Sequence, residues 1–306
     1  SMSLVTSAMS GLAADAPEPP RVAAITMSRD EADMLPRWVN YYGDQLGRDN
    51  LLILDDNSVD GSTDGLPCAV YRLPPSPWKT SFLAARGKLF NGIASGLLAC
   101  YDVVIATDVD EFLVPDPALH SGLVDYLSER SDRDAIAPLA LNVLHNARLE
   151  PPLDLTRPVL SQRRFVKFAP NMCRPVIKRI PADWRRHGIK APFEIDRDLW
   201  LMHLKYYDTA ALTTVAERRH VLHQQDGRGS SGSGWALRPD ELASRLLSWV
   251  VIPDGDDVPE FDPREPDITN IVQPGGGGLF RSEGQQLAAM EESPLRQLPE
   301  RFRQAL

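Results

Sequence analysis

Residues 102–115 read DVVIATDVDEFLVP, a run of strand-forming residues followed at once by closely spaced acids. Asp102 to Ala106 has the composition of a buried strand, and Asp108 and Asp110 follow it on alternate positions. Alternate side chains of an extended backbone point to the same side, so these two carboxylates could hold one divalent cation. The stretch therefore predicts a sheet strand with a metal site at its carboxyl end.

Strand-like and helix-like segments alternate upstream of this stretch. Apolar runs typical of buried strands lie at Arg21–Met27, Leu51–Leu54 and Ala69–Leu73. Apolar residues at helical spacing predict helices from Asp33 to Leu46 and from Ser81 to Cys100. This alternation predicts an α/β/α sandwich with a mainly parallel central sheet, and such sheets bind ligands beyond the carboxyl ends of their strands.

Polar residues gather at the carboxyl ends of three of these strands. The first strand runs into Ser28–Glu31, the second into Asp55–Ser58 and the fourth into Thr107–Glu111. Asp and Asn also open ordinary turns, so one such strand end means little by itself. Three acidic ends on one rim of a sheet favour a cation or nucleotide site.

The composition excludes several function classes. The chain has 33 Lys and Arg against 42 Asp and Glu, a formal net charge of −9. This balance argues against a nucleic-acid binder, because such proteins need a surplus of cations. The three cysteines are far apart, which is typical of free thiols in a reducing compartment. No apolar stretch reaches the roughly 18 residues of a membrane helix, so we expect a cytoplasmic protein with at most peripheral membrane contact.

The second half of the chain is less regular. Strands are expected at Ala135–Val143, Val166–Phe168, Val176–Ile180 and Leu199–Tyr206, and a helix at Pro239–Val250. Residues 227–234 read GRGSSGSG, a composition typical of a flexible linker or of a lid over a site. After residue 253 the chain is rich in proline, glycine and acids, which predicts an extended arm ending in a short helix.

Three segments together resemble the family 2 glycosyltransferases and their family 92 relatives, which share the GT-A fold of nucleotide-diphospho-sugar transferases. They are SRDEADMLPRWVNYY at 28–42, LDDNSVDGS at 54–62 and TDVDEFLVP at 107–115. Those families usually carry Asn-Glu where this chain has Asp-Glu at 30–31. The resemblance implies a Rossmann-like GT-A fold. The parts we expect are a tail at 1–20, a nucleotide-sugar-binding half at 21–115, an acceptor-binding half at 116–252 and the arm at 253–306.

The resemblance also implies which residues bind the nucleotide. Asp56 matches the acid that accepts a hydrogen bond from the base, and Arg29 lies on the loop that packs beside it. Arg86 matches a basic nucleotide contact, with Lys88 as its neighbour, although both could instead lie on a solvated helix face. Asp108 is expected to reach either the ribose or the metal.

The metal implied by the resemblance is Mn²⁺ or Mg²⁺. Asp108 and Asp110 match the acidic pair of the families' metal site, and Asp110 corresponds to the direct ligand. His203, in LMHLKYY, matches a late histidine that completes the metal shell. A histidine on a strand can equally be a packed core residue.

An inverting glycosyltransferase also needs a general base that takes the proton of the acceptor hydroxyl. Members of the families place an acid for this role between the metal motif and the late histidine. Glu194 and Asp196 are the best placed acids here, with Asp198 next. Trp235 follows the Gly/Ser loop directly, and its indole could close over a sugar as part of a lid.

The expected function is metal-dependent transfer of a single sugar from a nucleotide-diphosphate donor, expected to be UDP-linked, to a glycan or lipid-linked acceptor in polysaccharide assembly. Inversion is expected, although the fold also serves retaining enzymes. The Gln-x-x-Arg-Trp motif of processive synthases is missing, which favours a single transfer. The alternatives are a sugar-1-phosphate nucleotidyltransferase and an inactive sugar-nucleotide-binding scaffold. The first would need a Gly-rich basic loop after the first strand, where this chain has SRDEAD.

Overall fold

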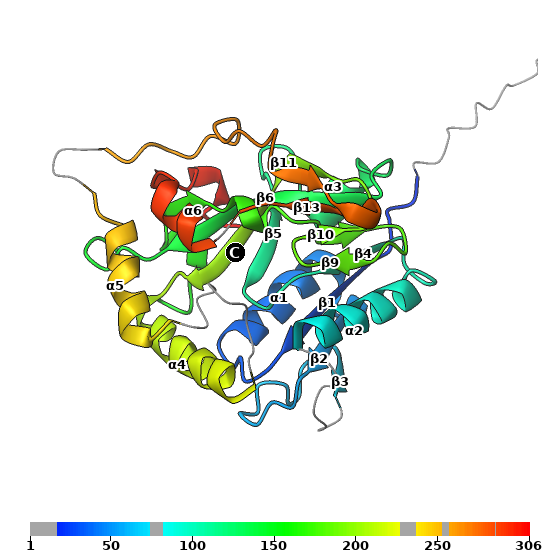
Figure 1. Ribbon diagram of the computed structural model, residues 1–306, viewed down its shortest axis with the longest axis horizontal. Helices are drawn as coiled ribbons and strands as arrows, with labels where there is room; N and C mark the ends of the chain where they lie inside the picture. Colours follow the sequence, from blue (N-terminus) through cyan, green and yellow to red (C-terminus); the bar gives the residue numbers. More distant parts are fainter. Residues whose placement is uncertain (1–16, 74–81, 227–236, 253–256, 285) are drawn as a thin grey trace, which may run out of the picture.

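The computed structural model describes residues 17–73, 82–226, 237–252, 257–284 and 286–306 (Figure 1). The strands are β1 (Val22–Ser28), β2 (Leu51–Asp55), β3 (Ala69–Arg72), β4 (Val103–Ala106), β5 (Glu111–Pro115), β6 (Ala135–Leu144), β7 (Phe165–Phe168), β8 (Ile177–Lys178), β9 (Trp184–Arg185), β10 (Gly188–Ile189), β11 (Glu194–Tyr206), β12 (Val272–Pro274), β13 (Phe280–Ser282) and β14 (Arg296–Gln297). The helices are α1 (Met34–Leu46), α2 (Phe82–Leu97), α3 (Leu123–Ser128), α4 (Thr209–Asp226), α5 (Pro239–Trp249) and α6 (Gln286–Glu292).

Helices α1 and α2 cover opposite faces of the sheet, which makes three layers. Side chains alternate along a strand, so β1 can bury apolar groups on both of its faces. Ala24 packs in one core with Trp38 of α1. Ile25, the next residue of β1, packs in a second core with Phe90 of α2. The predicted α/β sandwich is therefore confirmed in the first half of the chain.

The main sheet has the strand order β14-β7-β6-β8-β4-β1-β2-β3. Strands β4, β1, β2 and β3 run parallel, as predicted from the alternation of strands and helices. On the other side β8, β6, β7 and β14 pair antiparallel to their neighbours. The long strand β11 pairs parallel with β6 and antiparallel with β5, so it joins β5 to the rest of the main sheet.

Helix α4 is the main element that the sequence analysis did not predict. Its residues 209–226 show no apolar stripe at helical spacing, which is the signal that identifies an amphipathic helix. The helix nevertheless packs on α5, because Leu212 and Ala216 share a small core with Leu242 and Leu246. Helix α4 lies at the rim of the site described below.

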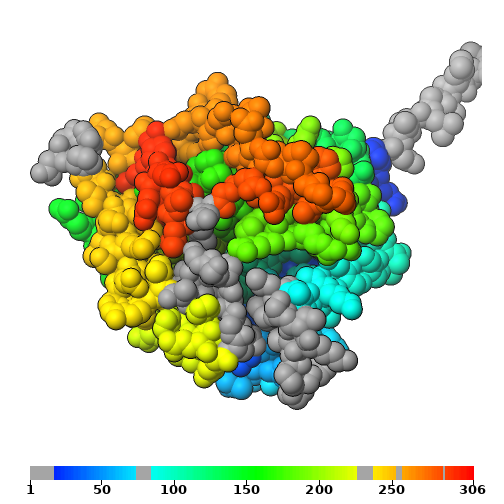
Figure 2. All heavy atoms as spheres, viewed as in Figure 1, coloured from blue at the N-terminus to red at the C-terminus, as the bar shows by residue number. Residues whose placement is uncertain are grey.

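The C-terminal segment, residues 257–306, is part of the body of the protein, so the expectation of an extended arm is wrong for its described residues. Strand β14 joins the main sheet, and β12 and β13 form a second sheet with β10 and β9. Phe261 and Phe302 are buried against Trp200 of β11, with ring centroids 5.3 and 4.2 Å from that indole. Figure 2 shows the orange and red residues of this segment spread over the green strands of the second half.

None of the described helices is both long enough and apolar enough to cross a lipid bilayer.

Candidate functional site

A cavity of about 1300 Å³ opens at the carboxyl ends of β1, β2 and β4. This is the rim of the sheet at which the sequence analysis placed the ligand. Residues of α2, of the segment 171–175, of β11, of α4 and of the hairpin formed by β9 and β10 also line it. The sequence-predicted residues that line it are Arg29, Asp56, Arg86, Lys88, Asp108, Asp110 and His203.

Arg29 and Asp56 lie together at one part of the cavity, with the guanidinium Nη1 3.8 Å from the carboxylate Oδ2. Two loops are tied together beneath them. Asp30 has φ of +52°, uncommon for a residue with a side chain, and its carboxylate accepts hydrogen bonds from the amides of Val59 and Asp60. Its own amide donates to Ser58 Oγ at 3.0 Å. The loops that follow β1 and β2 thus hold one another, and they hold Arg29 beside Asp56.

Residues 108–111 form a turn, so the expectation that Asp108 and Asp110 lie on one side of an extended backbone is wrong. Glu111 stabilises the turn, because its carboxylate accepts a hydrogen bond from the Asp108 amide and its own amide donates to the Asp108 carbonyl. Both acids still line the cavity, but they contact different partners. Asp108 pairs with Arg86 and lies 3.7 Å from Arg174. Burial raises the pKa of Asp108, but these two guanidinium groups outweigh it and the net pKa lies below the usual value.

Asp110 faces His203, the histidine that the resemblance assigned to the metal shell. The distance from His203 Nε2 to Asp110 Oδ2 is 3.7 Å, and both side chains are buried. The other ring nitrogen, Nδ1, lies 2.6 Å from the side-chain oxygen of Asn142 on β6. Because that oxygen can only accept, Nδ1 donates to Asn142, and Nε2 is the ring nitrogen that faces Asp110. Burial raises the pKa of Asp110, but His203 and Arg219 outweigh it and hold the pKa well below the ordinary value.

Asp110 and His203 fit a divalent cation as two of its ligands. A cation of this kind holds oxygen and nitrogen at about 2.1 Å, so two of its ligands lie roughly 3–4 Å apart. In the described part of the chain, no three His, Cys, Asp or Glu side chains come together as a complete metal site. Mg²⁺ and similar ions usually complete their shell with water and substrate phosphate, for which a two-residue site leaves room.

The sequence analysis missed six basic residues that line the cavity: Arg174, Arg185, Arg186, Lys205, Arg218 and Arg219. Arg174 donates two hydrogen bonds to buried Glu111 at 2.6 and 2.7 Å, and Arg219 lies 3.4 Å from Asp110. Burial and the neighbouring Arg219 lower the pKa of Lys205 to about 8. The pair of arginines in α4 is visible in the sequence as ERRH, but without a predicted helix nothing placed it near the acids.

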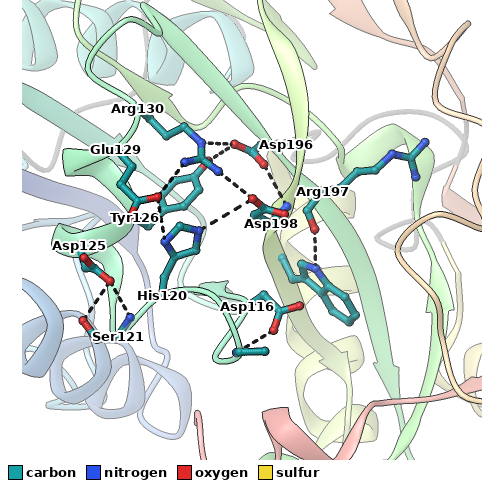
Figure 3. Close-up of polar contacts among 12 residues, drawn as sticks. Asp116, His120, Ser121, Asp125, Tyr126, Glu129, Arg130, Asp196, Arg197 and Asp198 are labelled. Atoms are coloured by element: carbon teal, nitrogen blue, oxygen red, sulfur yellow. Dashed lines mark hydrogen bonds and ion pairs between the residues drawn. The ribbon is translucent and has the colours of Figure 1, made fainter.

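Glu194 and Asp196, the expected general bases, do not line the cavity. Glu194 is exposed and pairs with Arg133. Asp196 accepts hydrogen bonds from Arg130 at 2.8 Å and Tyr126 at 2.9 Å, and Figure 3 shows Arg130 between Asp196 and Asp198. These acids lie at the start of β11, whereas the cavity residues lie toward its end. The prediction that Glu194 or Asp196 is the general base is therefore wrong, because neither side chain lines the cavity.

We expect Glu194→Gln to change the free energy of unfolding by less than about 0.5 kcal/mol, because an exposed ion pair contributes little. Its carboxylate is 72% exposed and its one partner, Arg133, is also at the surface. Urea unfolding followed by circular dichroism measures the change. A large loss of stability would contradict this prediction. Loss of sugar transfer by the folded variant would instead show that Glu194 takes part in the reaction.

Trp235 and the Gly/Ser loop 227–234 lie outside the described residues, so the expectation of a lid remains a prediction.

No protein-family model and no curated protein matches the chain. Among solved structures it is similar to a mannosyltransferase from Pyrobaculum calidifontis in complex with GDP-Man and Mn²⁺, at 18% identity and TM-score 0.29, over 40% of this chain and 36% of that one. It is similar to glucosyl-3-phosphoglycerate synthase from Mycobacterium tuberculosis in complex with Mn²⁺, UDP-glucose and phosphoglyceric acid, at 18% identity and TM-score 0.28, over 40% and 44%.

A mannose-1-phosphate geranyltransferase from Thermus thermophilus has 9% identity and TM-score 0.28, over 74% of this chain and 64% of that one. The chain thus spans less than half of the length of the first two proteins. Similarities of this extent establish neither a family nor a substrate, and the function is inferred from the cavity.

Proposed function

We propose that this chain is a GT-A-type glycosyltransferase that moves one sugar from a nucleotide-diphosphate donor, UDP-linked, to an acceptor hydroxyl with inversion. One observation carries the proposal: Arg29 and Asp56, which would bind the base, line the same cavity as Asp110 and His203, which would hold the cation. A nucleotide-diphosphate sugar has the base and the diphosphate that such a site would take. Residues 21–115 would bind the donor and 116–252 the acceptor, a glycan or lipid-linked hydroxyl of cytoplasmic polysaccharide assembly.

In this proposal Asp56 accepts a hydrogen bond from an N–H of the base, and Arg29 packs beside it. Asp110 and His203 hold Mn²⁺ or Mg²⁺, with Asn142 fixing the tautomer of the imidazole. The bound cation supplies charge stabilisation for the departing diphosphate. Arg219 contacts both Asp110 and Glu31, so it keeps a carboxylate partner when Asp110 takes a cation.

The transfer itself requires a base that removes the acceptor proton while the oxygen attacks the anomeric carbon. Because Glu194 and Asp196 do not line the cavity, the proposal requires that another group of the cavity wall accepts this proton. Arg86 and Lys205, on different walls of the cavity, add positive charge to which the leaving diphosphate can bind.

The cavity fits a sugar-1-phosphate nucleotidyltransferase less well. That reaction binds a triphosphate at the loop after the first strand, and here Glu31 follows β1 and lines the cavity. Burial raises the pKa of Glu31, yet Arg218 at 3.3 Å and Arg219 at 3.7 Å pair with it. An acid at this position opposes a triphosphate and occupies two of the nearby arginines.

The test is thermal unfolding with UDP, GDP, CDP and ADP, each with and without MnCl₂. A nucleotide at about 100 times its dissociation constant stabilises the folded state by roughly 2.7 kcal/mol. We expect UDP with Mn²⁺ to give the largest shift in Tm, and we expect Asp110→Asn to abolish the part of the shift that depends on Mn²⁺. Asp44→Asn, an exposed acid of α1 that pairs with Arg48, is the matched control.

Failure of every nucleotide to shift the wild-type transition would contradict the proposal, as would an unchanged Mn²⁺-dependent shift in Asp110→Asn. Binding with no turnover of any donor sugar, followed by chromatography of the released nucleotide, would favour the inactive scaffold.

A further inference from the structure

We propose that the acceptor of this enzyme carries a negatively charged group, a phosphate or a carboxylate, which is bound by the turn between β9 and β10 and the facing part of α2. The inference rests on the proposed function and adds the chemical class of the second substrate. It is carried by the balance of charge in the cavity and by the rigidity of this part of its wall.

The cavity is basic although the whole chain is acidic. Among the described residues, nine Lys or Arg side chains and six Asp or Glu side chains line it, a surplus of three positive charges in a protein of net charge −9. The basic residues are Arg29, Arg86, Lys88, Arg174, Arg185, Arg186, Lys205, Arg218 and Arg219, and the acids are Glu31, Asp56, Asp108, Asp110, Glu111 and Asp183. Concentrating like charges in this way is unfavourable unless an anion binds there.

The donor does not use up this surplus. A nucleotide-diphosphate sugar carries two negative charges, and one divalent cation neutralises both. With the cation bound, the cavity keeps its surplus of three positive charges, and without the cation it still keeps one. A second ligand with a negative group is therefore the natural complement of the loaded site.

Apart from Lys205 on β11, the unpaired part of this charge among the described residues lies on the wall made by α2 and the β9–β10 turn. Within the described residues, neither Lys88 nor Arg186 has an ion pair, whereas Arg86 and Arg174 are each paired with a buried or half-buried acid. Arg185 pairs with Asp183 at 3.3 Å, but both side chains are more than 40% exposed, so that pair is weak.

The turn that carries Arg185 and Arg186 is held firmly in place. The side chain of Asn91 on α2 binds both the amide and the carbonyl of Trp184, at 2.7 and 3.0 Å. On the other side, the Ser282 amide donates to the His187 carbonyl at 2.8 Å. Gly188 allows β13 to approach closely, since a Cβ there would lie 2.2 Å from the Phe280 carbonyl oxygen.

Lys88 belongs to the same wall. It precedes Asn91 by three residues on α2, and residues three apart lie on one face of a helix. The side chain of Asn91 contacts the β9 strand, and both Asn91 and Lys88 line the cavity, so Lys88 belongs to the wall that α2 forms beside β9. Burial lowers the pKa of His187 to about 4, which leaves its ring neutral at pH 7 and the positive charge of the wall with Lys88, Arg185 and Arg186.

Arginine suits this task because its planar guanidinium donates two parallel hydrogen bonds to a phosphate or a carboxylate. A firmly held turn also loses little conformational freedom when a ligand binds. An uncharged glycan hydroxyl would instead leave Arg186 without an ionic partner among the described residues and Arg185 with only its exposed pair to Asp183.

The experiment titrates glycerol phosphate, glycerate and glycerol into the protein saturated with UDP and MnCl₂, with binding followed by calorimetry. We expect glycerol phosphate to bind and glycerol not to bind. If glycerate also binds, a carboxylate is sufficient for binding. If glycerol phosphate binds and glycerate does not, the negative group of the acceptor is a phosphate. Arg185→Gln combined with Arg186→Gln should weaken glycerol phosphate at least tenfold and change the Kd of UDP less than twofold.

Arg264→Gln, an exposed arginine paired only with Asp262, is the matched control and should leave both affinities unchanged. The inference is overturned if neither anion binds the loaded protein, or if the double variant weakens UDP as much as glycerol phosphate. If no nucleotide binds at all, the proposed function has failed. Binding of glycerol phosphate to the free protein, lost in the double variant, would then still support the anion site, and its absence would overturn the inference too.

Discussion

Trp200→Ala is expected to lower the free energy of unfolding by about 3–5 kcal/mol, the usual range for deleting a large aromatic side chain from a core. Trp200 is fully buried on β11 and its indole stacks on Phe302 at 4.2 Å, with Phe261 edge-on at 5.3 Å. The substitution would open a cavity between the sheet and the C-terminal segment. Urea unfolding followed by circular dichroism measures the loss.

The same variant tests whether the C-terminal segment is docked. With Trp200 replaced, residues 257–306 should become more accessible, and limited proteolysis should cut there first. Trp200→Phe, which keeps an aromatic ring, is the control and should lose clearly less stability. A loss below about 1 kcal/mol with an unchanged proteolysis pattern would show that this segment does not depend on the stacked rings.

Arg130→Met is expected to cost roughly 3 kcal/mol at pH 7, because it leaves Asp196 buried without its cation. Arg130 donates to Asp196 and to Asp198, each at 2.8 Å, and the Asp196 side chain is 10% exposed (Figure 3). Urea unfolding at pH 7 and at pH 5 measures the effect. Arg133→Met removes an arginine from the exposed Glu194 pair and should change stability by less than about 0.5 kcal/mol.

The dependence on pH has a definite sign. Burial raises the pKa of Asp196, but hydrogen bonds from Arg130 and Tyr126 outweigh it and hold the pKa below the ordinary value of 3.8. In the wild-type protein Asp196 therefore stabilises the fold above that value, and this contribution is lost as the pH falls through the lowered pKa. Without Arg130 the burial remains and the pKa rises above the ordinary value. The deficit of the variant relative to wild type should then shrink from pH 7 to pH 5, and a deficit that grows would contradict this account.

Sequence reasoning located the parallel half of the fold well because that half depends on local pattern. Helix α1 and strand β2 begin and end within one residue of their expected limits, since their apolar spacing and flanking polar residues are unambiguous. The same reasoning missed α4, whose contacts with α5 come from tertiary packing and not from a stripe of its own. Its arginines could be assigned to the cavity only once the helix was placed.

The residues of the candidate site were predicted with similarly unequal success. Asp56, Asp108 and Asp110 follow strands of the parallel part of the sheet, and the carboxyl ends of parallel strands all lie at the same edge of a sheet. Glu194 and Asp196 belong to a strand whose partners, β5 and β6, are antiparallel and parallel to it, so the sequence could not show which end reaches the cavity. Arg174 lies between short elements, where no periodic pattern in the sequence shows which way its side chain points.

Strand β11 also limits how the length of this chain can vary. One of its ends holds Asp196 beside Arg130, and the other brings His203 opposite Glu111 and Asn142 of the neighbouring strands. Side chains alternate along a strand, so one residue inserted between 199 and 203 would turn His203 away from Asp110. Insertions and deletions in homologous chains should therefore avoid this interval and collect in exposed loops such as residues 151–157.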